Sequence, residues 1–76
     1  MLETKKWLVT TFFTTAAAME TEKRCHERGV EGKLIPVPRH ITADCGLAWR
    51  GEPADRQILE VLLSDLEVED YFEVEL

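Results

Sequence analysis

The sequence predicts an α+β domain in which strands and helices alternate as β-α-β-β-α-β. Three observations predict it: a helix-forming run at residues 15–28, an apolar helical stripe at residues 58–66, and an alternating segment at residues 71–76. With 76 residues, we expect one domain that spans residues 1–76. A chain this short buries only about 60% of its unfolded surface, so its core is thin and a functional group belongs on a surface loop.

Three strands are expected in the first two thirds of the chain. Residues 6–13 are rich in Trp, Val, Thr and Phe, and their apolar side chains fall on both faces. Such a strand is either central and covered on both sides, or lies at a dimer contact. Residues 30–37 form a second strand that Pro36 and Pro38 confine to an edge. Residues 46–50 form a short third strand.

The first helix has clear start and stop signals. Thr14 and Thr15 offer side-chain oxygens that cap a helix over residues 15–28, and Gly29 supplies its end. Cys25 lies on one stripe of this helix with small residues. We therefore expect Cys25 to face the core and to serve packing rather than chemistry.

The last third of the chain predicts a helix and a strand. Pro53 is well placed to begin the helix. Its apolar stripe consists of Ile58, Leu59, Leu62, Leu63 and Leu66. Residues 71–76 then alternate, with Phe72, Val74 and Leu76 on one side, as in a strand with one solvent-exposed face.

This element order is the split βαβ pattern of ferredoxin-like folds. Right-handed crossovers give a four-stranded antiparallel sheet with both helices on one face. The connection at residues 38–45 would then project at one end of the sheet, where a rigid scaffold commonly presents functional groups.

Composition argues against several classes of partner. The formal net charge of −6 disfavours nucleic acid, because phosphates are bound mainly by Lys and Arg. The longest mostly apolar stretch, residues 7–13, is too short to span a bilayer, and residues 1–6 lack the apolar run of a signal peptide. Two scattered cysteines do not form a disulfide framework, so we expect a reducing, cytoplasmic location.

Cys45 is the candidate reactive group. It lies in the one locally cationic segment, residues 33–50, which holds three Lys or Arg against a single acidic residue. The basic residues nearest to Cys45 in sequence are Arg39, His40 and Arg50. Their charges would favour a nucleophilic thiolate, whereas Asp44 would oppose it. Gly46 lacks a side chain and would let a reaction partner approach closely.

These residues also form a recognisable pattern. Leu-Ile-Pro-Val-Pro-Arg at residues 34–39 is followed by Cys-Gly-Leu-Ala at residues 45–48 and by Arg50. The pattern resembles that of the small bacterial family of selenium/sulfur carrier-like proteins, and the similarity extends over residues 7–50. Two features depart from it: residues 40–44 contain only Thr42 where the family tends to have several Ser, and Cys25 takes a position that is more often leucine.

The resemblance implies that Cys45 holds sulfur or selenium as a persulfide or selenopersulfide and passes it on. The partners implied are a protein donor and a protein acceptor, with no cofactor, and the chain would be a carrier rather than a turnover enzyme. Arg39, His40, Gly46 and Arg50 would surround the cargo. Pro36 and Pro38 would shape the loop.

Other interpretations stay open at this point. Cys45 could be an inert packing residue, and Arg39 could be merely solvated. The chain could instead be a non-catalytic binding or regulatory module that docks on a redox or metal-assembly protein, or it could form a homodimer. A thiol enzyme is less favoured, because no Cys-x-x-Cys pair occurs. We predict no metal site, since the cysteines and histidines lack the spacing of structural zinc sites.

Overall fold

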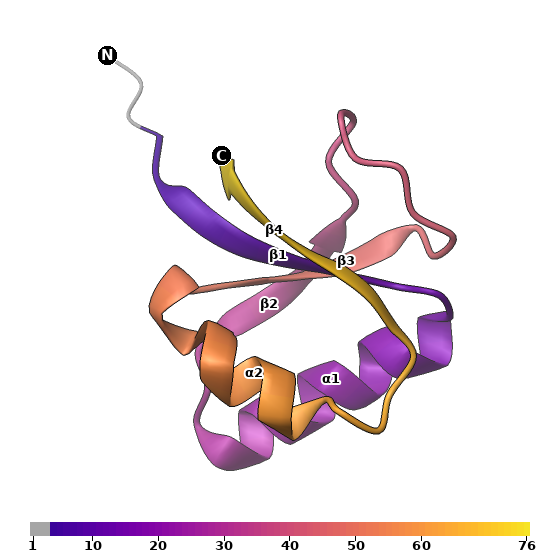
Figure 1. Cartoon of the computed structure of the whole chain (residues 1–76), viewed down its shortest axis with the longest axis vertical. Helices are drawn as coiled ribbons and strands as arrows, with labels where there is room; N and C mark the ends of the chain where they lie inside the picture. Colours follow the sequence, from indigo (N-terminus) through magenta and orange to yellow (C-terminus); the bar gives the residue numbers. More distant parts are fainter. Residues whose placement is uncertain (1–3) are drawn as a thin grey trace.

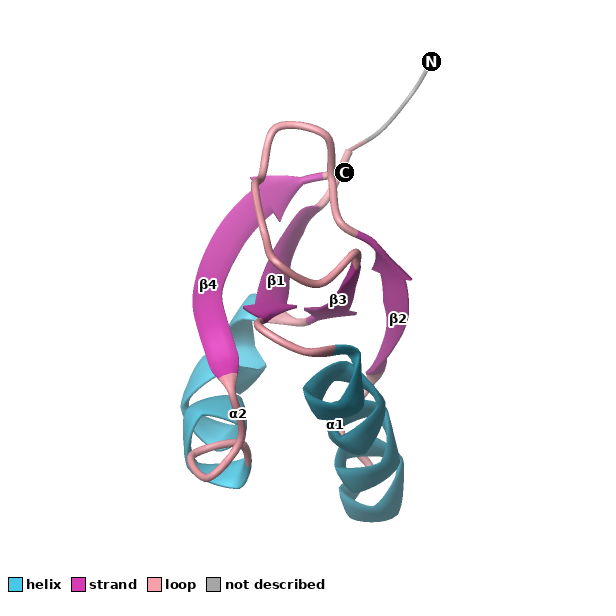
Figure 2. Cartoon of the chain, turned by 90° about the vertical axis from the view of Figure 1, so that its right-hand side faces the viewer, coloured by secondary structure: helices cyan, strands magenta, loops and turns pink. Residues whose placement is uncertain are grey.

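A computed structural model describes residues 4–76, and residues 1–3 of the predicted domain lie outside the described part. The elements in chain order are β1 (Lys6–Phe12), α1 (Thr15–Arg28), β2 (Gly32–Pro36), β3 (Leu47–Gly51), a 3₁₀ turn η1 (Pro53–Asp55), α2 (Arg56–Leu62) and β4 (Val68–Glu75) (Figure 1). The four strands form one antiparallel sheet in the order β2-β3-β1-β4. Both helices cover one face of the sheet (Figure 2), so the predicted ferredoxin-like arrangement is confirmed.

The first helix occupies the predicted residues. Thr14 is its N-cap, and its hydroxyl oxygen accepts a hydrogen bond from the Ala17 N–H at 3.1 Å. Gly29 ends α1 with a φ of 69°, a left-handed conformation that glycine adopts without a steric penalty. The direction and start of α1 are therefore fixed by residues next to the end of β1.

The second helix is shorter than predicted. It ends at Leu62, although the apolar stripe continues to Leu66. The Arg24 guanidinium donates to the Leu62 carbonyl at 3.0 Å and also binds Asp65, so it satisfies a carbonyl at the helix end. Tight turns follow. The predicted stripe is otherwise confirmed for its buried members, but Ile58 is 52% exposed and does not belong to the core.

The strand ends differ slightly from those expected. β1 stops at Phe12, and Phe13 turns out of the sheet with its N–H bonded to the Glu67 carbonyl. β4 begins at Val68 rather than at residue 71, because its pairing with β1 continues through an irregularity to the Phe12–Val68 pair. Phe72 and Val74 pack on the helix-free side of the sheet, as the alternation predicts, but the other face of β4 is not fully solvent-exposed, because Tyr71 packs against the helix-side layer.

Two apolar layers lie on opposite sides of the sheet. The helix-side layer contains Leu8, Phe12, Trp49, Leu59 and Leu63 together with both cysteines. The helix-free layer is smaller and is built on Val9 and Ala48. β1 contributes buried side chains to both layers, which confirms that it is a central strand covered on both sides.

The connection between β2 and β3 does not project freely, and that prediction is wrong. It folds over the helix-free face of the sheet (Figure 2), where Ile41 is 9% exposed and packs with Val9 and Ala48. The reason is physical: the part of this face around Val9 and Ala48 is apolar and no helix covers it, so one apolar side chain in the connection is stabilised by packing there. The Glu69 carboxylate also accepts the Asp44 N–H at 3.2 Å.

Gly32 makes the close packing of β2 on Trp49 possible, which gives a first prediction. A side chain at Gly32 would meet the Arg50 carbonyl oxygen at 2.5 Å and the Trp49 ring at 2.7 Å, and φ is +152°. We expect Gly32→Ala to lower the free energy of unfolding by about 3 kcal/mol in urea denaturation followed by tryptophan fluorescence. Gly46→Ala is the matched control, because its side chain would meet nothing within 4 Å. Equal stability of the two variants would contradict this account.

Candidate functional site

Cys45 lies in the bend that leads into β3. Its N–H donates to the Phe12 carbonyl at 3.1 Å, which ties it to the end of β1. The residue is 5% exposed and packs in the helix-side layer, so the expectation of a solvent-facing thiol is wrong. The flanking residues Asp44 and Gly46 are exposed, and the sulfur therefore lies just beneath the surface.

Two neutral groups contact the Cys45 sulfur. The Leu47 N–H donates to Cys45 Sγ at 3.4 Å, and the Thr15 hydroxyl lies 3.6 Å from the same sulfur. Thr15 is the first residue of α1. The first N–H groups of a helix have no acceptor within it and carry a partial positive charge. The sulfur thus has one backbone N–H donor in β3 and one hydroxyl contact at the start of α1.

The predicted basic residues are not gathered around this sulfur. Arg50 lies opposite Val9 on the helix-free side of the sheet, and its guanidinium stacks 4.2 Å above the Trp7 ring. Arg39 and His40 are exposed in a turn that the Ile41 N–H closes onto the Pro38 carbonyl. Within residues 4–76, no side-chain hydrogen bond or ion pair involves these three basic residues.

The predicted loop residues flank the connection. A side chain at Gly46 would meet no atom within 4 Å, so the space beside Cys45 is open there. Pro36 is the last residue of the edge strand β2, where a missing N–H is tolerated. Pro38 opens the turn that contains Arg39 and His40. This placement suits the loop-shaping role predicted for the two prolines.

Cys25 is a buried thiol of a different kind. It is 0% exposed in the core, as the sequence predicts. Burial raises the pKa of the Cys25 thiol to about 11, and the Asp55 carboxylate adds to the increase. Cys25 lies ten residues along α1 from Thr15, about 15 Å at 1.5 Å per residue. Because Thr15 contacts the Cys45 sulfur, the two thiols are too far apart for a disulfide.

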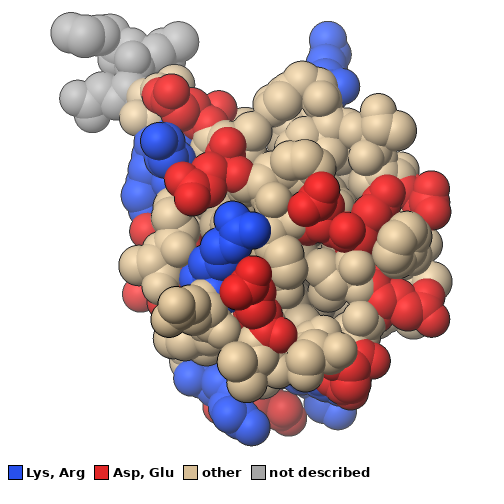
Figure 3. Space-filling model, in the orientation of Figure 1, with Lys and Arg blue, Asp and Glu red and all other residues tan. Residues whose placement is uncertain are grey.

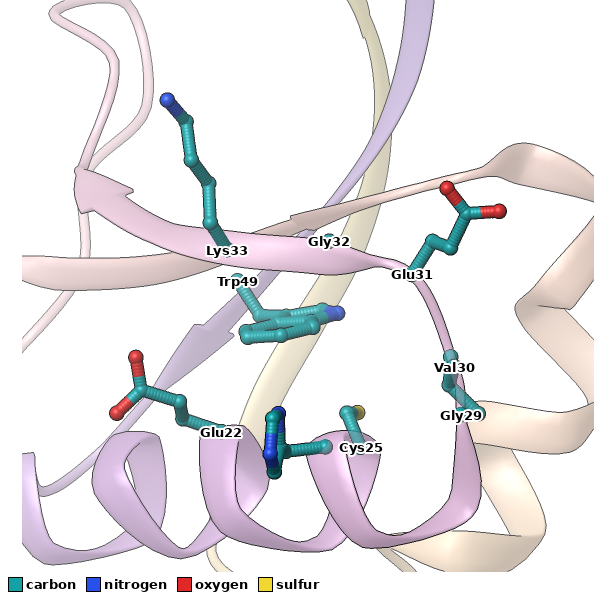
Figure 4. A pocket seen from close by; sticks show the side chains of 9 residues that line it. Glu22, Cys25, Gly29, Val30, Glu31, Gly32, Lys33 and Trp49 are labelled. Atoms are coloured by element: carbon teal, nitrogen blue, oxygen red, sulfur yellow. The ribbon is translucent and has the colours of Figure 1, made fainter.

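A hollow near Cys25 was not predicted. Its volume is about 420 Å³, and it lies between α1 and β2, with Trp49, Cys25 and His26 among its lining residues (Figure 4). The Trp49 Nε1 is buried and has no hydrogen-bond partner among the described residues. The hollow is at the opposite end of α1 from Cys45. It therefore belongs to a different part of the molecule from the candidate thiol.

The surface is predominantly acidic. In Figure 3, acidic side chains dominate the part of the surface to the right of its centre.

No group of three His, Cys, Asp or Glu side chains suited to a metal ion occurs within residues 4–76. Neither α1 nor α2 in the described part of the chain has the length and apolar character needed to cross a bilayer.

Comparison with known proteins identifies the family. Residues 8–73 match the family model described as "Putative Se/S carrier protein-like", and the chain belongs to this family. The match extends beyond the motif region through α2 and into β4. No curated protein and no solved structure matches the chain.

The raised pKa of Cys25 predicts a dependence of stability on alkaline pH. The fold favours the neutral thiol, so its contribution is complete below the ordinary thiol pKa of about 9 and is lost as pH rises towards about 11.

The measurement is urea denaturation between pH 8 and pH 11. We expect the free energy of unfolding to fall more steeply with rising pH for the wild type than for Cys25→Ala. The comparison uses the slopes, so the lower stability of the variant at pH 8 does not affect it. The pKa of Tyr71 is also raised, chiefly by burial, but its titration is common to both proteins. Parallel pH profiles would contradict the assignment of Cys25 as a neutral core thiol.

Proposed function

We propose that this protein carries sulfur or selenium as a persulfide or selenopersulfide on Cys45 and transfers it between protein partners. The observation that carries the proposal is the position of the Cys45 sulfur, between the Leu47 N–H and the Thr15 hydroxyl at the start of α1. Membership of the selenium/sulfur carrier-like family supports it. The reducing cytoplasm, where a free thiol persists, is the location that suits this chemistry.

The chemistry requires only one thiol. The Cys45 thiolate attacks the terminal sulfur of a persulfide on the donor protein. The sulfur–sulfur bond of the donor breaks, its electron pair leaves with the donor thiolate, and a new persulfide forms on Cys45. Release runs in the opposite sense, when an acceptor nucleophile attacks the terminal sulfur and Cys45 departs as a thiolate. No net oxidant is consumed, and selenium follows the same course.

The cargo atom extends from a sulfur that is nearly buried. Asp44 and Gly46 are exposed on either side of Cys45, and the space beside Gly46 is open. A small rotation of Cys45 towards Gly46 would bring its terminal sulfur within reach of a partner. In the resting position the Leu47 N–H and Thr15 hydroxyl would stabilise the anionic form of the cargo.

The isolation of Cys45 favours a carrier over an enzyme. Cys25 lies too far along α1 to attack a persulfide on Cys45, so a loaded chain has no internal route to a disulfide. The acceptor must supply its own nucleophile. Arg39 and His40 stand in an exposed turn of the connection that ends at Cys45, and we propose that they contact the partner rather than the cargo.

A docking module is the second candidate. Ile58 is 52% and Val61 is 77% exposed on α2. They line a groove of about 930 Å³ between α1 and α2. An exposed apolar pair beside a groove suits a contact with a protein, either a larger redox or metal-assembly partner or a second copy. This role would not need the thiol.

Loading of the thiol can be measured directly. We expect intact-protein mass spectrometry to detect the mass of one added sulfur after incubation with a cysteine desulfurase and cysteine. The gain should map to Cys45 in the wild type and in Cys25→Ser, because Cys25 is shielded by the core. Cys45→Ser should show no gain.

Two outcomes would contradict the carrier role. One is an unmodified wild-type protein under conditions that load a known thiol carrier. The other is equal loading of the wild type and Cys45→Ser. A pull-down that captures the same partner with wild type and Cys45→Ser, without loading of either, would favour the docking module.

A further inference from the structure

Two basic side chains face each other across the sheet. Lys33 on β2 and Arg50 on β3 are direct partners in the antiparallel register. Partners in such a register lie on the same face, here the helix-free one that Arg50 shares with Val9 and Trp7. Like charges directly opposite each other destabilise a sheet. Within residues 4–76, neither side chain forms an ion pair that would offset this repulsion.

The Arg50 guanidinium also has an unused donor. Its Nε is buried and has no hydrogen-bond partner among the described residues. Its carbon lies 4.2 Å from the centre of the Trp7 ring, and the Lys5 Nζ lies 4.0 Å from the same ring. Aromatic stacking holds the guanidinium in place but accepts none of its hydrogen bonds. A buried, charged donor without an acceptor indicates a place where an acceptor belongs.

The acidic residues closest in sequence do not fill this role. Glu52, two residues beyond Arg50, is engaged by Lys5 in an ion pair. Glu31, two residues before Lys33, rises on the same side of β2 as Lys33 but leans away from the Lys33 amine along the strand (Figure 4), and it forms none of the ion pairs within residues 4–76. The positive charges of Lys33 and Arg50 are thus not balanced by an ion pair within residues 4–76, although the formal net charge of the protein is −6.

We infer that Lys33 and Arg50 bind a phosphate-type dianion on the helix-free face of the sheet, beside Trp7. Two uncompensated positive charges match a dianion, whereas a carboxylate would leave one of them unbalanced. The planar guanidinium can donate two parallel hydrogen bonds to one phosphate group, and the Lys33 ammonium supplies the second charge. Donation from Nε–H would require the Arg50 side chain to turn, because this nitrogen is buried in the structure.

This site is separate from the thiol and does not rest on the proposed carrier function. Leu47, which donates to the Cys45 sulfur, is three residues from Arg50 along β3, or about 10 Å. The two side chains also point to opposite faces, since Cys45 packs on the helix side and Arg50 lies on the helix-free side. An anion at Arg50 is therefore not the cargo of Cys45.

Titration followed by NMR tests the inference. In ¹⁵N-labelled protein, the Arg50 Nε–Hε resonance should shift to saturation as inorganic phosphate is added at constant ionic strength, and acetate should shift it far less. Lys33→Met should weaken phosphate binding at least about fivefold, as expected for the loss of one close charge. Lys23→Met is the matched control, because Lys23 is exposed on α1 and removes the same charge elsewhere. It should leave the affinity unchanged.

A second variant separates geometry from charge. Arg50→Lys keeps the charge but removes the planar donor, and we expect it to bind phosphate more weakly than the wild type. O-phospho-L-serine is titrated in parallel. Tighter binding of phosphoserine than of phosphate indicates a phosphorylated protein as the source of the group, and equal binding indicates free phosphate.

Several outcomes would reject the phosphate site. A linear, unsaturated response to phosphate, or the same response to phosphate and acetate, means an adventitious ion only. The same affinity in Lys33→Met and Lys23→Met would also reject the site. Each of these outcomes is independent of whether Cys45 can be loaded with sulfur.

Discussion

The hydrogen bond from the Cys45 N–H to the Phe12 carbonyl holds the candidate site together. It joins the start of β3 to the end of β1, at the point where the chain turns into α1. Because Thr14 caps the helix two residues later, the first turn of α1 is fixed against the same place. The Cys45 sulfur therefore lies beside Thr15, and no charged side chain is needed to hold it there. The chemistry proposed for Cys45 depends on this contact between the bend before β3 and the start of α1.

Much of the fold could be predicted because local signals agree with one another. Residues 15–28 combine caps, helix formers and a glycine stop, and α1 has those limits. The burial of Cys25 also follows from its position on the helical stripe. The end of α2 could not be read from the stripe alone, since Arg24 on another helix donates to the carbonyl of its last residue, Leu62. Contacts between elements decided that boundary.

The candidate site was only partly predictable. The motif identified Cys45 and the family, but proximity in sequence wrongly suggested that Arg50 lies near the thiol. Cys45 lies in the bend before β3, where the alternation of side chains along a strand does not apply, so the sequence could not place its sulfur relative to Arg50. Ile41 was a usable signal, because a lone apolar residue between polar neighbours indicated that the connection folds back onto the sheet.

The two faces of the sheet have different chemical characters. The helix side encloses both thiols, whereas the helix-free side presents Lys33, Arg50 and Trp7 on an otherwise acidic molecule. The acidic residues of the edge strand β4 oppose pairing between the β4 edges of two copies.

The most direct test of the account is whether the Thr15 hydroxyl sets the reactivity that we propose for the Cys45 thiol. The rate of alkylation by iodoacetamide at neutral pH would be measured in a Cys25→Ala background. We expect Thr15→Val, which keeps the shape but removes the hydroxyl, to slow the reaction about fivefold, the effect of roughly 1 kcal/mol. Thr15→Ser should react like the parent protein, and so should Arg39→Gln and Arg50→Gln. A normal rate in Thr15→Val together with a large loss in either arginine variant would contradict the proposal that the Thr15 hydroxyl, at the start of α1, activates this sulfur.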